Sequence, residues 1–297
     1  MSAPVLLVTG GSRGIGAAVA RRAAQQGYDV ALTYVRDGDA AERVAGEVRA
    51  HGRRALTIRA DAGREEDVTR TFAEVDASLG ALSVLVYNSA ITGRNSRLDE
   101  AESATIRHVL EVNVLGAMLH AREAVRRMST KHGGRGGSIV FLSSRAALYG
   151  SPGEYVWYAA SKGAIDSLTA GLAREVGREG IRVNAVSPGP IDTDMQAPGR
   201  LERVVQINPM GRAGTPEEAA QAIAFSSDSR VMILLGRRSS ASTFMTSSPI
   251  FSATVPFSSS SAGTMAEPPG EMPSASNAQA MVFAVNWPPQ APALGQA

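Results

Sequence analysis

The sequence predicts an α/β fold in which helices cover both faces of a doubly wound parallel sheet. Short apolar runs such as Val5–Val8 alternate with longer segments of helical periodicity, and strands buried on both faces have this composition. A glycine-rich turn separates the first apolar run from the first helical segment. With 297 residues, the chain is long enough to form one large domain of this kind and to bury a sizeable core.

The alternating strand and helix units extend to about Phe225. The expected strands are Val5–Val8, Asp29–Tyr34, Ala55–Arg59, Leu82–Tyr87, Ser138–Leu142 and Ile181–Val186. The expected helices are Ile15–Gln26, Asp39–Ala50, Glu65–Leu79, Ala104–Thr130, Val156–Arg178 and a helix that begins at Pro216 after the N-cap Thr215. Because crossovers between parallel strands of one sheet are right-handed, these units predict a single doubly wound sheet.

Composition excludes several classes of function. The formal net charge is +2 and basic residues are scattered among acidic ones, so we expect no nucleic-acid partner. The absence of cysteine excludes disulfides and thiol chemistry and fits a reducing compartment, so we expect a cytoplasmic protein. The chain begins with no signal peptide, and the apolar run Val231–Leu235 is too short to span a bilayer, so no membrane partner is expected. No metal site is predicted.

The character of the chain changes after Phe225. Residues 226–297 carry six charged side chains, against 52 in the first 225, and serine, proline, alanine and methionine dominate them. Because neither a strand period nor a helix period persists there, this segment cannot bury enough apolar surface to offset its chain entropy. We expect residues 1–225 to form the only domain and residues 226–297 to be a disordered, low-complexity tail.

The glycine-rich turn after the first strand has the pattern of a phosphate-binding loop. Gly10 would permit a tight turn, Gly14 would let a pyrophosphate approach the backbone, and Gly16 would allow close packing of the next helix. The amides and the positive dipole end of that helix would attract the phosphates. The spacing Gly-x-x-x-Gly-x-Gly differs from the commoner Gly-x-Gly-x-x-Gly, so the general dinucleotide motif is met only in part.

Tyr158 and Lys162 are four residues apart in an expected helix and therefore lie on one face of it. A neighbouring ammonium favours the phenolate and lowers the pKa of a tyrosine from its ordinary value of about 10. Such a tyrosine can give a proton to a carbonyl oxygen or take one from an alcohol. The spacing alone is a weak motif, but Asn113 in an expected helix and Ser144 after an expected strand accompany it.

Taken together, these features resemble the short-chain dehydrogenase/reductase family, in the branch of 3-oxoacyl-carrier-protein reductases and glucose dehydrogenases. The matching motifs, in family order, are Thr9-Gly10-x-x-x-Gly14-Ile15-Gly16, Asp61, Asn88-Ser89-Ala90, Asn113, Ser144, Tyr158-x-x-x-Lys162 and Asn184-x-x-Ser187-Pro188-Gly189. They cover residues 5–225, about three quarters of the chain. The resemblance implies a single Rossmann domain that binds both a nicotinamide cofactor and a small-molecule substrate.

The resemblance also implies a role for each matched residue. Tyr158 would transfer the proton, and Lys162 would bind the nicotinamide ribose and lower the pKa of Tyr158. Ser144 would hold the substrate oxygen, and Asn113 would anchor a water that links Lys162 to solvent. The residues expected to contact the cofactor are Gly10, Ser12, Arg13, Gly14, Ile15, Gly16, Arg36, Asp61, Asn88, Ser89, Ala90, Tyr158, Lys162, Pro188, Gly189, Ile191 and Thr193.

Two features depart from the family pattern. The interval from Ser144 to Tyr158 is fourteen residues where the family usually has thirteen, and we assign the extra residue to the loop 148–154, which can absorb it at little cost. Ser143 is the alternative partner of Tyr158. The other departure is Tyr87-Asn88-Ser89-Ala90 in place of Asn-Asn-Ala-Gly, which still places small residues at a strand end.

The choice between NADP and NAD follows from charge. A ribose 2′-hydroxyl is usually bound by an acid at the end of the second strand, whereas a 2′-phosphate needs an arginine. The second strand ends without an acid at Thr33 or Tyr34, while Arg36 follows it and Arg13 lies in the glycine turn. Asp37 and Asp39 fall in the turn after the strand, so NAD stays an alternative to the favoured NADP.

The favoured function is an NADP(H)-dependent oxidoreductase that interconverts a carbonyl and a secondary alcohol. The alternatives are a non-catalytic dinucleotide-binding protein and a damaged, inactive member of the family. Relatives commonly form homodimers or homotetramers through the helices that carry Asn113 and Tyr158, and the resemblance implies the same here. After Phe225 the family pattern is lost, which we interpret as a reading-frame shift near residues 225–230. The seventh strand would then be missing, and the edge beside the sixth strand would be uncovered.

Overall fold

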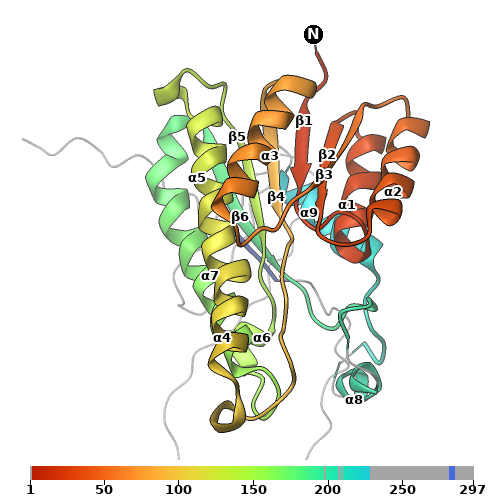
Figure 1. Ribbon diagram of the computed structural model, residues 1–297, viewed down its shortest axis with the longest axis vertical. Helices are drawn as coiled ribbons and strands as arrows, with labels where there is room; N and C mark the ends of the chain where they lie inside the picture. The colour runs from red at the N-terminus through yellow and green to blue at the C-terminus, as the bar shows by residue number, and fades with distance from the viewer. Residues whose placement is uncertain (1, 197–198, 207, 209, 228–280, 285–297) are drawn as a thin grey trace, which may run out of the picture.

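The structure is a sheet with helices packed on both faces (Figure 1). The computed structural model describes residues 2–196, 199–206, 208, 210–227 and 281–284. The strand order is β3-β2-β1-β4-β5-β6-β7. The first six strands are parallel, which confirms the doubly wound, Rossmann-type architecture predicted from the sequence.

The elements alternate along the chain as predicted. The parallel strands are β1 (Val5–Val8), β2 (Asp29–Tyr34), β3 (Ala55–Arg59), β4 (Leu82–Tyr87), β5 (Gly137–Leu142) and β6 (Ile181–Ser187). The longer helices are α1 (Gly14–Gln25), α2 (Gly38–Ala50), α3 (Glu65–Ser78), α4 (Ser103–Leu110), α5 (Gly116–Met128), α7 (Val156–Val176) and α9 (Pro216–Ser227). The sequence reasoning missed two short helices, α6 (Ala146–Tyr149) and α8 (Arg200–Gln206). Single 3-10 turns lie at Leu98–Glu100, Thr130–His132 and Gly177–Glu179.

Each face of the sheet has its own apolar core, because neighbouring strand residues point to opposite faces. In β1, Leu7 belongs to the cluster beneath α3, α5 and α7, whereas Leu6 and Val8 belong to the cluster beneath α1, α2 and α9. All four residues of β1 are buried. This explains why the central strands are fully apolar in sequence instead of alternating.

The helix predicted over Ala104–Thr130 is present but changes its winding in the middle. Between α4 and α5, the residues Glu111–Leu115 form a single π-helical turn, and Asn113 lies within it. Such turns are rare inside α-helices and are frequent at functional sites. The turn therefore supports Asn113 as a candidate site residue.

The prediction that the seventh strand is missing is wrong. Residues Met281–Ala284 form β7, which pairs antiparallel with β6, with Met281 opposite Ser187. The unpaired peptide groups of an exposed strand edge favour pairing with any extended segment, and this short apolar run supplies one. The rest of the tail, residues 228–280 and 285–297, lies outside the described residues. The predictions of a disordered tail and of a frame shift near residues 225–230 fall mostly on those residues.

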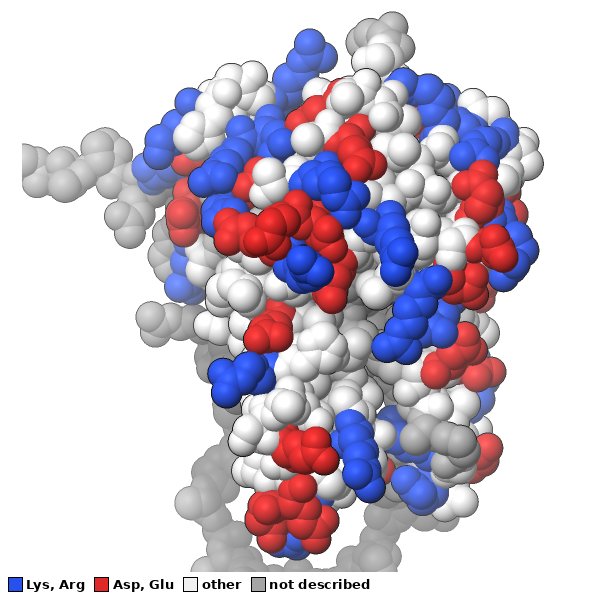
Figure 2. Space-filling model, viewed as in Figure 1, with Lys and Arg blue, Asp and Glu red and all other residues white. Residues whose placement is uncertain are grey.

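Basic and acidic side chains intermingle over the surface. On the face shown in Figure 2, Lys and Arg alternate with Asp and Glu and form no continuous basic stripe among the described residues. Within the same part of the chain, we find no helix whose length and apolarity would suffice to cross a membrane.

Gly16 provides a test of how tightly the glycine turn packs against the sheet. A Cβ atom at Gly16 would clash with the carbonyl oxygen of Gly10 and would lie 2.7 Å from Nδ2 of Asn88. We expect Gly16→Ala to lower the free energy of unfolding by about 1–3 kcal/mol, because the backbone must move to admit the methyl group. Denaturant unfolding followed by circular dichroism measures the change.

Gly46 provides the matched control for this substitution. It lies inside α2, and a methyl group added there would meet no side chain and no other segment of the chain within 4 Å. We expect Gly46→Ala to stabilise the protein by about 0.5–1 kcal/mol, since alanine loses less backbone entropy in a helix. If both substitutions changed the free energy of unfolding in the same direction, the close contact assigned to Gly16 would be contradicted.

Candidate active site

The glycine turn is fixed to the carboxyl ends of two neighbouring strands. The hydroxyl of Thr9 accepts hydrogen bonds from the backbone amides of Asn88 at 3.0 Å and Ser89 at 2.9 Å, just beyond β4. In return, Nδ2 of Asn88 donates to the carbonyl oxygens of Thr9 at 2.9 Å and Gly10 at 3.1 Å. The amide of Gly10 donates to the hydroxyl of Thr33 at the end of β2, at 3.1 Å. These bonds hold the turn in one conformation, with Gly10 at a φ of 63°.

The N-terminus of α1 fits a phosphate group. No side chain caps it and its first turn holds no acid, so its first amides have no side-chain partner. By contrast, Asp37 caps α2 and three acids lie in the first turn of α3. Open amides and the positive dipole end of a helix attract anions. The turn around Gly14 therefore suits the pyrophosphate of a dinucleotide, and Ser12 and Ile15, both half-buried, flank it.

The segment after β6 closes over this turn. The methyl group of Thr193 lies 3.4 Å from the position that a Cβ of Gly14 would occupy. A backbone bridge joins Ile191 to Gly214, and Pro188 accepts a hydrogen bond from the amide of Arg145 at 3.1 Å. Gly189 is exposed between them. The structure thus brings the predicted residues after β6 beside the predicted glycine turn.

Asn113 joins the segment after β4 to α7. Its Oδ1 accepts from the amide of Ile91 at 2.9 Å, and its Nδ2 donates to the carbonyl oxygen of Ile91 at 2.9 Å and to the hydroxyl of Ser161 at 3.0 Å. Ser161 in turn donates to the carbonyl oxygen of Tyr158 at 2.7 Å. Ala90, half-buried, directly precedes Ile91. Asn113 thus braces the backbone of Tyr158, and its role as a water anchor stays a prediction.

Ser144, and not Ser143, is the partner of Tyr158. The side chains of Ser144 and Tyr158 share a hydrogen bond, and Ser144 also accepts from the amide of Ala146 at 3.1 Å. Ser143 is buried and turns away, donating to the carbonyl oxygen of Lys162 at 3.2 Å and bonding the carboxyl group of Asp166. The fourteen-residue interval does not disturb this pairing.

The loop between Ser144 and Tyr158 contains several left-handed residues, and the position of its extra residue stays a prediction. Gly150 and Gly153 adopt left-handed conformations, with φ angles of 75° and 72°. Ser151 between them has a φ of 45° and is the one residue other than glycine with a positive φ in the described part of the chain. Three left-handed residues within four positions let the chain reverse tightly between α6 and α7.

Lys162 is buried beneath Tyr158. Its side chain is 3 % exposed, Nζ donates to the carbonyl oxygen of Leu142 at 2.6 Å, and Nζ lies 5.6 Å from the centre of the Tyr158 ring. Burial lowers the pKa of Lys162 to about 8, because the low-dielectric interior disfavours the ammonium, while the charge of Asp166 opposes this. The ammonium is therefore close to titrating at physiological pH.

The prediction that Lys162 lowers the pKa of Tyr158 below its ordinary value is wrong for this arrangement. Burial of the phenol raises the pKa of Tyr158, and the hydrogen bond from Ser144 and the charge of Arg200 only partly oppose this. The physical reason is that Nζ of Lys162 is directed to Leu142 and makes no hydrogen bond to the phenol. In this arrangement the side chain of Tyr158 is a neutral phenol at neutral pH.

Sequence reasoning missed one charged residue at this site, Asp166, and favoured a solvated-loop role for a second, Arg200. Asp166 lies one helical turn beyond Lys162, and burial raises its pKa. Asp166 follows Lys162 by four residues, and this spacing could have indicated from the sequence that the two lie on one face of the helix. Arg200 on α8 bonds Glu154 at 2.9 Å and packs over the ring of Tyr155 at 5.8 Å. Nothing in the sequence pattern indicates that contact.

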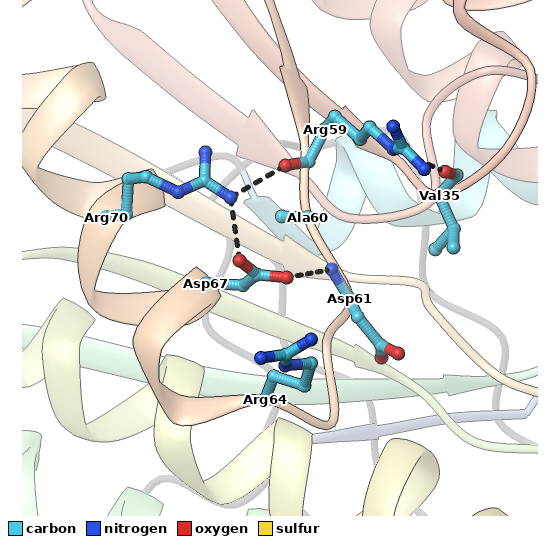
Figure 3. Close-up of a pocket in the computed structure, with 7 residues that line it drawn as sticks. All are labelled: Val35, Arg59, Ala60, Asp61, Arg64, Asp67 and Arg70. Atoms are coloured by element: carbon cyan, nitrogen blue, oxygen red, sulfur yellow. Dashed lines mark hydrogen bonds and ion pairs between the residues drawn. The ribbon is translucent and has the colours of Figure 1, made fainter.

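A hollow of about 320 Å³ lies at the carboxyl end of β3, at the opposite end of the site (Figure 3). Its lining residues are Val35, Arg59, Ala60, Asp61, Arg64, Asp67 and Arg70. Asp61 receives a hydrogen bond from the amide of Gly63 at 2.9 Å and donates its own amide to Asp67 at 2.9 Å. The predicted cofactor residue Asp61 thus faces this hollow.

The two arginines predicted to bind the cofactor lie on the surface. Arg36 is exposed, and no hydrogen bond or ion pair holds its side chain within the described ranges. Arg13 lies 3.8 Å from Asp194, and both side chains are 75 % exposed, so this ion pair is weak. In the same part of the chain, no group of His, Asp and Glu side chains is suited to hold a metal ion.

Comparison with known proteins identifies the family. The family model described as Enoyl-(Acyl carrier protein) reductase matches residues 10–233. The chain belongs to the short-chain dehydrogenase/reductase family. It is 48 % identical over 223 residues to the uncharacterized oxidoreductase YgfF of Escherichia coli (strain K12), a match that covers 74 % of this chain and 90 % of that protein.

Two solved structures add the cofactor class. The short-chain dehydrogenase from Burkholderia cenocepacia J2315, in complex with NADP, is 37 % identical with a TM-score of 0.69 and covers 75 % of this chain and 89 % of its own. The 3-ketoacyl-(acyl-carrier-protein) reductase from Brucella melitensis, complexed with NADH, is 30 % identical with a TM-score of 0.71. The match covers 77 % of this chain and 92 % of that reductase. The protein is an NAD(P)-dependent oxidoreductase of this family, and its cofactor is a nicotinamide dinucleotide.

The burial of Lys162 predicts a pH dependence of stability. An unfolded lysine has a pKa of about 10.4, so between pH 8 and pH 10 the unfolded state binds more protons than the folded state. The stability of the protein should therefore rise through this window relative to that of Lys162→Met, by an amount on the order of 2 kcal/mol. Urea unfolding of both proteins at pH 7, 8, 9 and 10 measures the difference. Parallel stability curves would show that Lys162 is not buried as an ammonium.

Proposed function

We propose that the protein is an NADP(H)-dependent reductase that interconverts a carbonyl and a secondary alcohol. The observation that carries this proposal is the cluster of Ser144, Tyr158 and Lys162 at the carboxyl ends of the strands. A protein that only bound the dinucleotide would need the glycine turn but not this cluster. A bound nicotinamide would supply or accept the hydride.

The side chains of the site have separate tasks in this reaction. When a carbonyl is reduced, negative charge grows on its oxygen, and the hydroxyls of Ser144 and Tyr158 can both donate hydrogen bonds there. Tyr158 then gives its proton to that oxygen, which completes the alcohol, and in the reverse direction it takes the proton back. Burial raises the pKa of Tyr158, so the phenol carries the proton that the reductive step needs.

Lys162 serves the proton transfer from behind the ring of Tyr158. Its positive charge would offset part of the cost that burial imposes on the tyrosinate, while the net pKa of Tyr158 stays raised. We assign Lys162 the further task of binding the nicotinamide ribose, as the family resemblance implies. Through its hydrogen bond to Ser161, Asn113 fixes the part of α7 that carries both residues.

The charges at the adenosine end support NADP over NAD. Asp37, the acid closest to the end of β2, accepts a hydrogen bond from the amide of Ala40 at 2.8 Å and so caps α2. Its carboxylate is therefore already engaged. Arg36 and Arg13 remain exposed and open to an anion. A 2′-phosphate would gain charge-assisted hydrogen bonds there that a 2′-hydroxyl would not.

We also propose that two copies of the chain pair through the helices that carry Asn113 and Tyr158. Leu110, Leu115 and Met118 are each more than two fifths exposed and follow one another along α4, the π turn and α5. Burying them against a second copy would remove this apolar surface from water.

Removal of the Tyr158 hydroxyl tests the catalytic proposal. We expect Tyr158→Phe to lower kcat by at least about two orders of magnitude, the usual contribution of a general acid, and to leave cofactor affinity nearly unchanged. Lys162→Ala should harm both quantities, because Lys162 has two roles. Steady-state assays with a panel of ketones and aldehydes, together with cofactor fluorescence titrations, measure them. Dinucleotide binding without turnover in the parent would instead favour the non-catalytic or inactive alternatives.

Cofactor preference is tested by removing the two surface arginines. We expect the parent to bind NADPH more tightly than NADH, and Arg13→Ala with Arg36→Ala to weaken NADPH binding alone. A charge-assisted contact is worth roughly 1.5–3 kcal/mol, or about one to two powers of ten in Kd. Fluorescence titration of both cofactors gives the ratio, and a parent that prefers NADH would contradict the assignment.

A further inference from the structure

We propose that Arg59, the last residue of β3, is a further binding residue for the 2′-phosphate of NADP(H), acting together with Arg36 at the end of β2. The inference rests on the NADP preference proposed above and extends it to a residue on a different strand. Arg59 belongs to no family motif of the sequence and looks there like an ordinary charged residue at a strand end. Its geometry suggests a more specific role.

The sheet register places Arg59 beside the end of β2. Arg59 pairs with Tyr34, which directly precedes Val35 and Arg36. Its Nε donates a hydrogen bond to the carbonyl oxygen of Val35 at 3.2 Å, and Figure 3 shows the guanidinium turned toward Val35. In this class of fold, the residues just after the second strand contact the 2′ position of the adenosine ribose. The guanidinium of Arg59 is therefore held at that position by the backbone.

The backbone of Arg59 is held from its other side as well. Nη2 of Arg70 donates to the carbonyl oxygen of Arg59 at 2.8 Å and to Oδ1 of Asp67 at 2.7 Å, as the dashed lines in Figure 3 show. The two ends of Arg59 are thus fixed before any ligand arrives. A guanidinium that is already oriented loses less conformational freedom on binding than a free surface side chain, which increases the binding energy of each contact.

The terminal nitrogens of Arg59 have no partner within the described ranges of the chain. The acids near it are engaged elsewhere: Asp67 with Arg70 and the amide of Asp61, Asp61 with the amide of Gly63, and Asp37 with the cap of α2. Arg70, by contrast, pairs with both Asp67 and Glu74. Of the arginines lining the hollow, Arg59 is the one fixed at the end of β2 with unused donors. Its remaining N–H groups suit an anion with several acceptor oxygens, such as a phosphate.

A pair of nucleotides that differ only by the 2′-phosphate tests this assignment. Adenosine 2′,5′-bisphosphate and adenosine 5′-monophosphate can be titrated into the full-length protein by calorimetry, and the ratio of the two Kd values isolates the contribution of the 2′-phosphate. We expect Arg59→Gln to reduce that ratio about ten-fold, through weaker binding of the bisphosphate alone. Arg59→Lys keeps the charge but loses the Nε–H group that bonds Val35, so its ratio should fall between those of the parent and Arg59→Gln.

Arg43→Gln is the matched control. Arg43 is exposed on α2, the helix that follows Arg36, and its substitution removes the same charge from the same side of the sheet. We expect its ratio to stay within about two-fold of the parent value, which would show that position and not net charge decides the effect. Unchanged binding of adenosine 5′-monophosphate by Arg59→Gln would show that the subsite itself is intact.

The outcomes separate this inference from the function on which it rests. A parent that binds both nucleotides equally would overturn the NADP preference and the role of Arg59 with it. If the parent discriminates, and Arg36→Gln abolishes the discrimination while Arg59→Gln leaves it within about two-fold, the NADP preference stands and the role of Arg59 is overturned. If Arg59→Gln and Arg59→Lys both weaken the binding of the two nucleotides by the same factor, Arg59 only supports the fold. That result would also overturn the proposal.

Discussion

The hydrogen bonds of the Thr9 hydroxyl are the interaction on which the site depends. They join the end of β1 to the first residues after β4, while Gly10 is tied to Thr33 at the end of β2. Three strands are thereby fixed in register at their carboxyl ends. The uncapped amides of α1 point from this fixed turn, so an anion meets donors that need no reorganisation. The positions of the residues predicted to bind the cofactor therefore follow from sheet pairing, which two apolar cores stabilise.

The end of the candidate site that holds Tyr158 and Lys162 destabilises the fold. Lys162 is an ammonium buried to 3 % exposure with a single carbonyl partner, and the phenol of Tyr158 is desolvated beside it. Both groups have shifted pKa values because burial disfavours their charged forms. A packed apolar pair would stabilise the helix more, but neither member of it could move a proton. The cores on the two faces of the sheet supply the stability that this arrangement gives up.

The sequence predicted the parts of the structure that depend on local pattern. The six parallel strands, the glycine turn and the Tyr158–Lys162 pair follow from apolar runs, glycine spacing and helical period, and the structure confirms their arrangement. It could not predict contacts between distant segments. The packing of Arg200 over Tyr155 and the bond from Arg59 to Val35 depend on how loops and strand ends meet after folding. The sign of the pKa shift of Tyr158 was predicted wrongly for the same reason, since it depends on burial more than on spacing.

The edge strand shows where sequence pattern and pairing physics diverge. The match to the family model ends at residue 233, yet β7 still pairs with β6, because an exposed edge offers unpaired peptide groups to any extended apolar segment. The pairing is antiparallel, whereas the six strands that hold the site are parallel, so β7 extends the sheet without adding to the row of carboxyl ends. The predicted site residues lie on β1 to β6, on the segments after them and on the helices between. All the predicted site residues therefore precede Phe225, and β7 pairs along the edge of the strand that leads to Pro188.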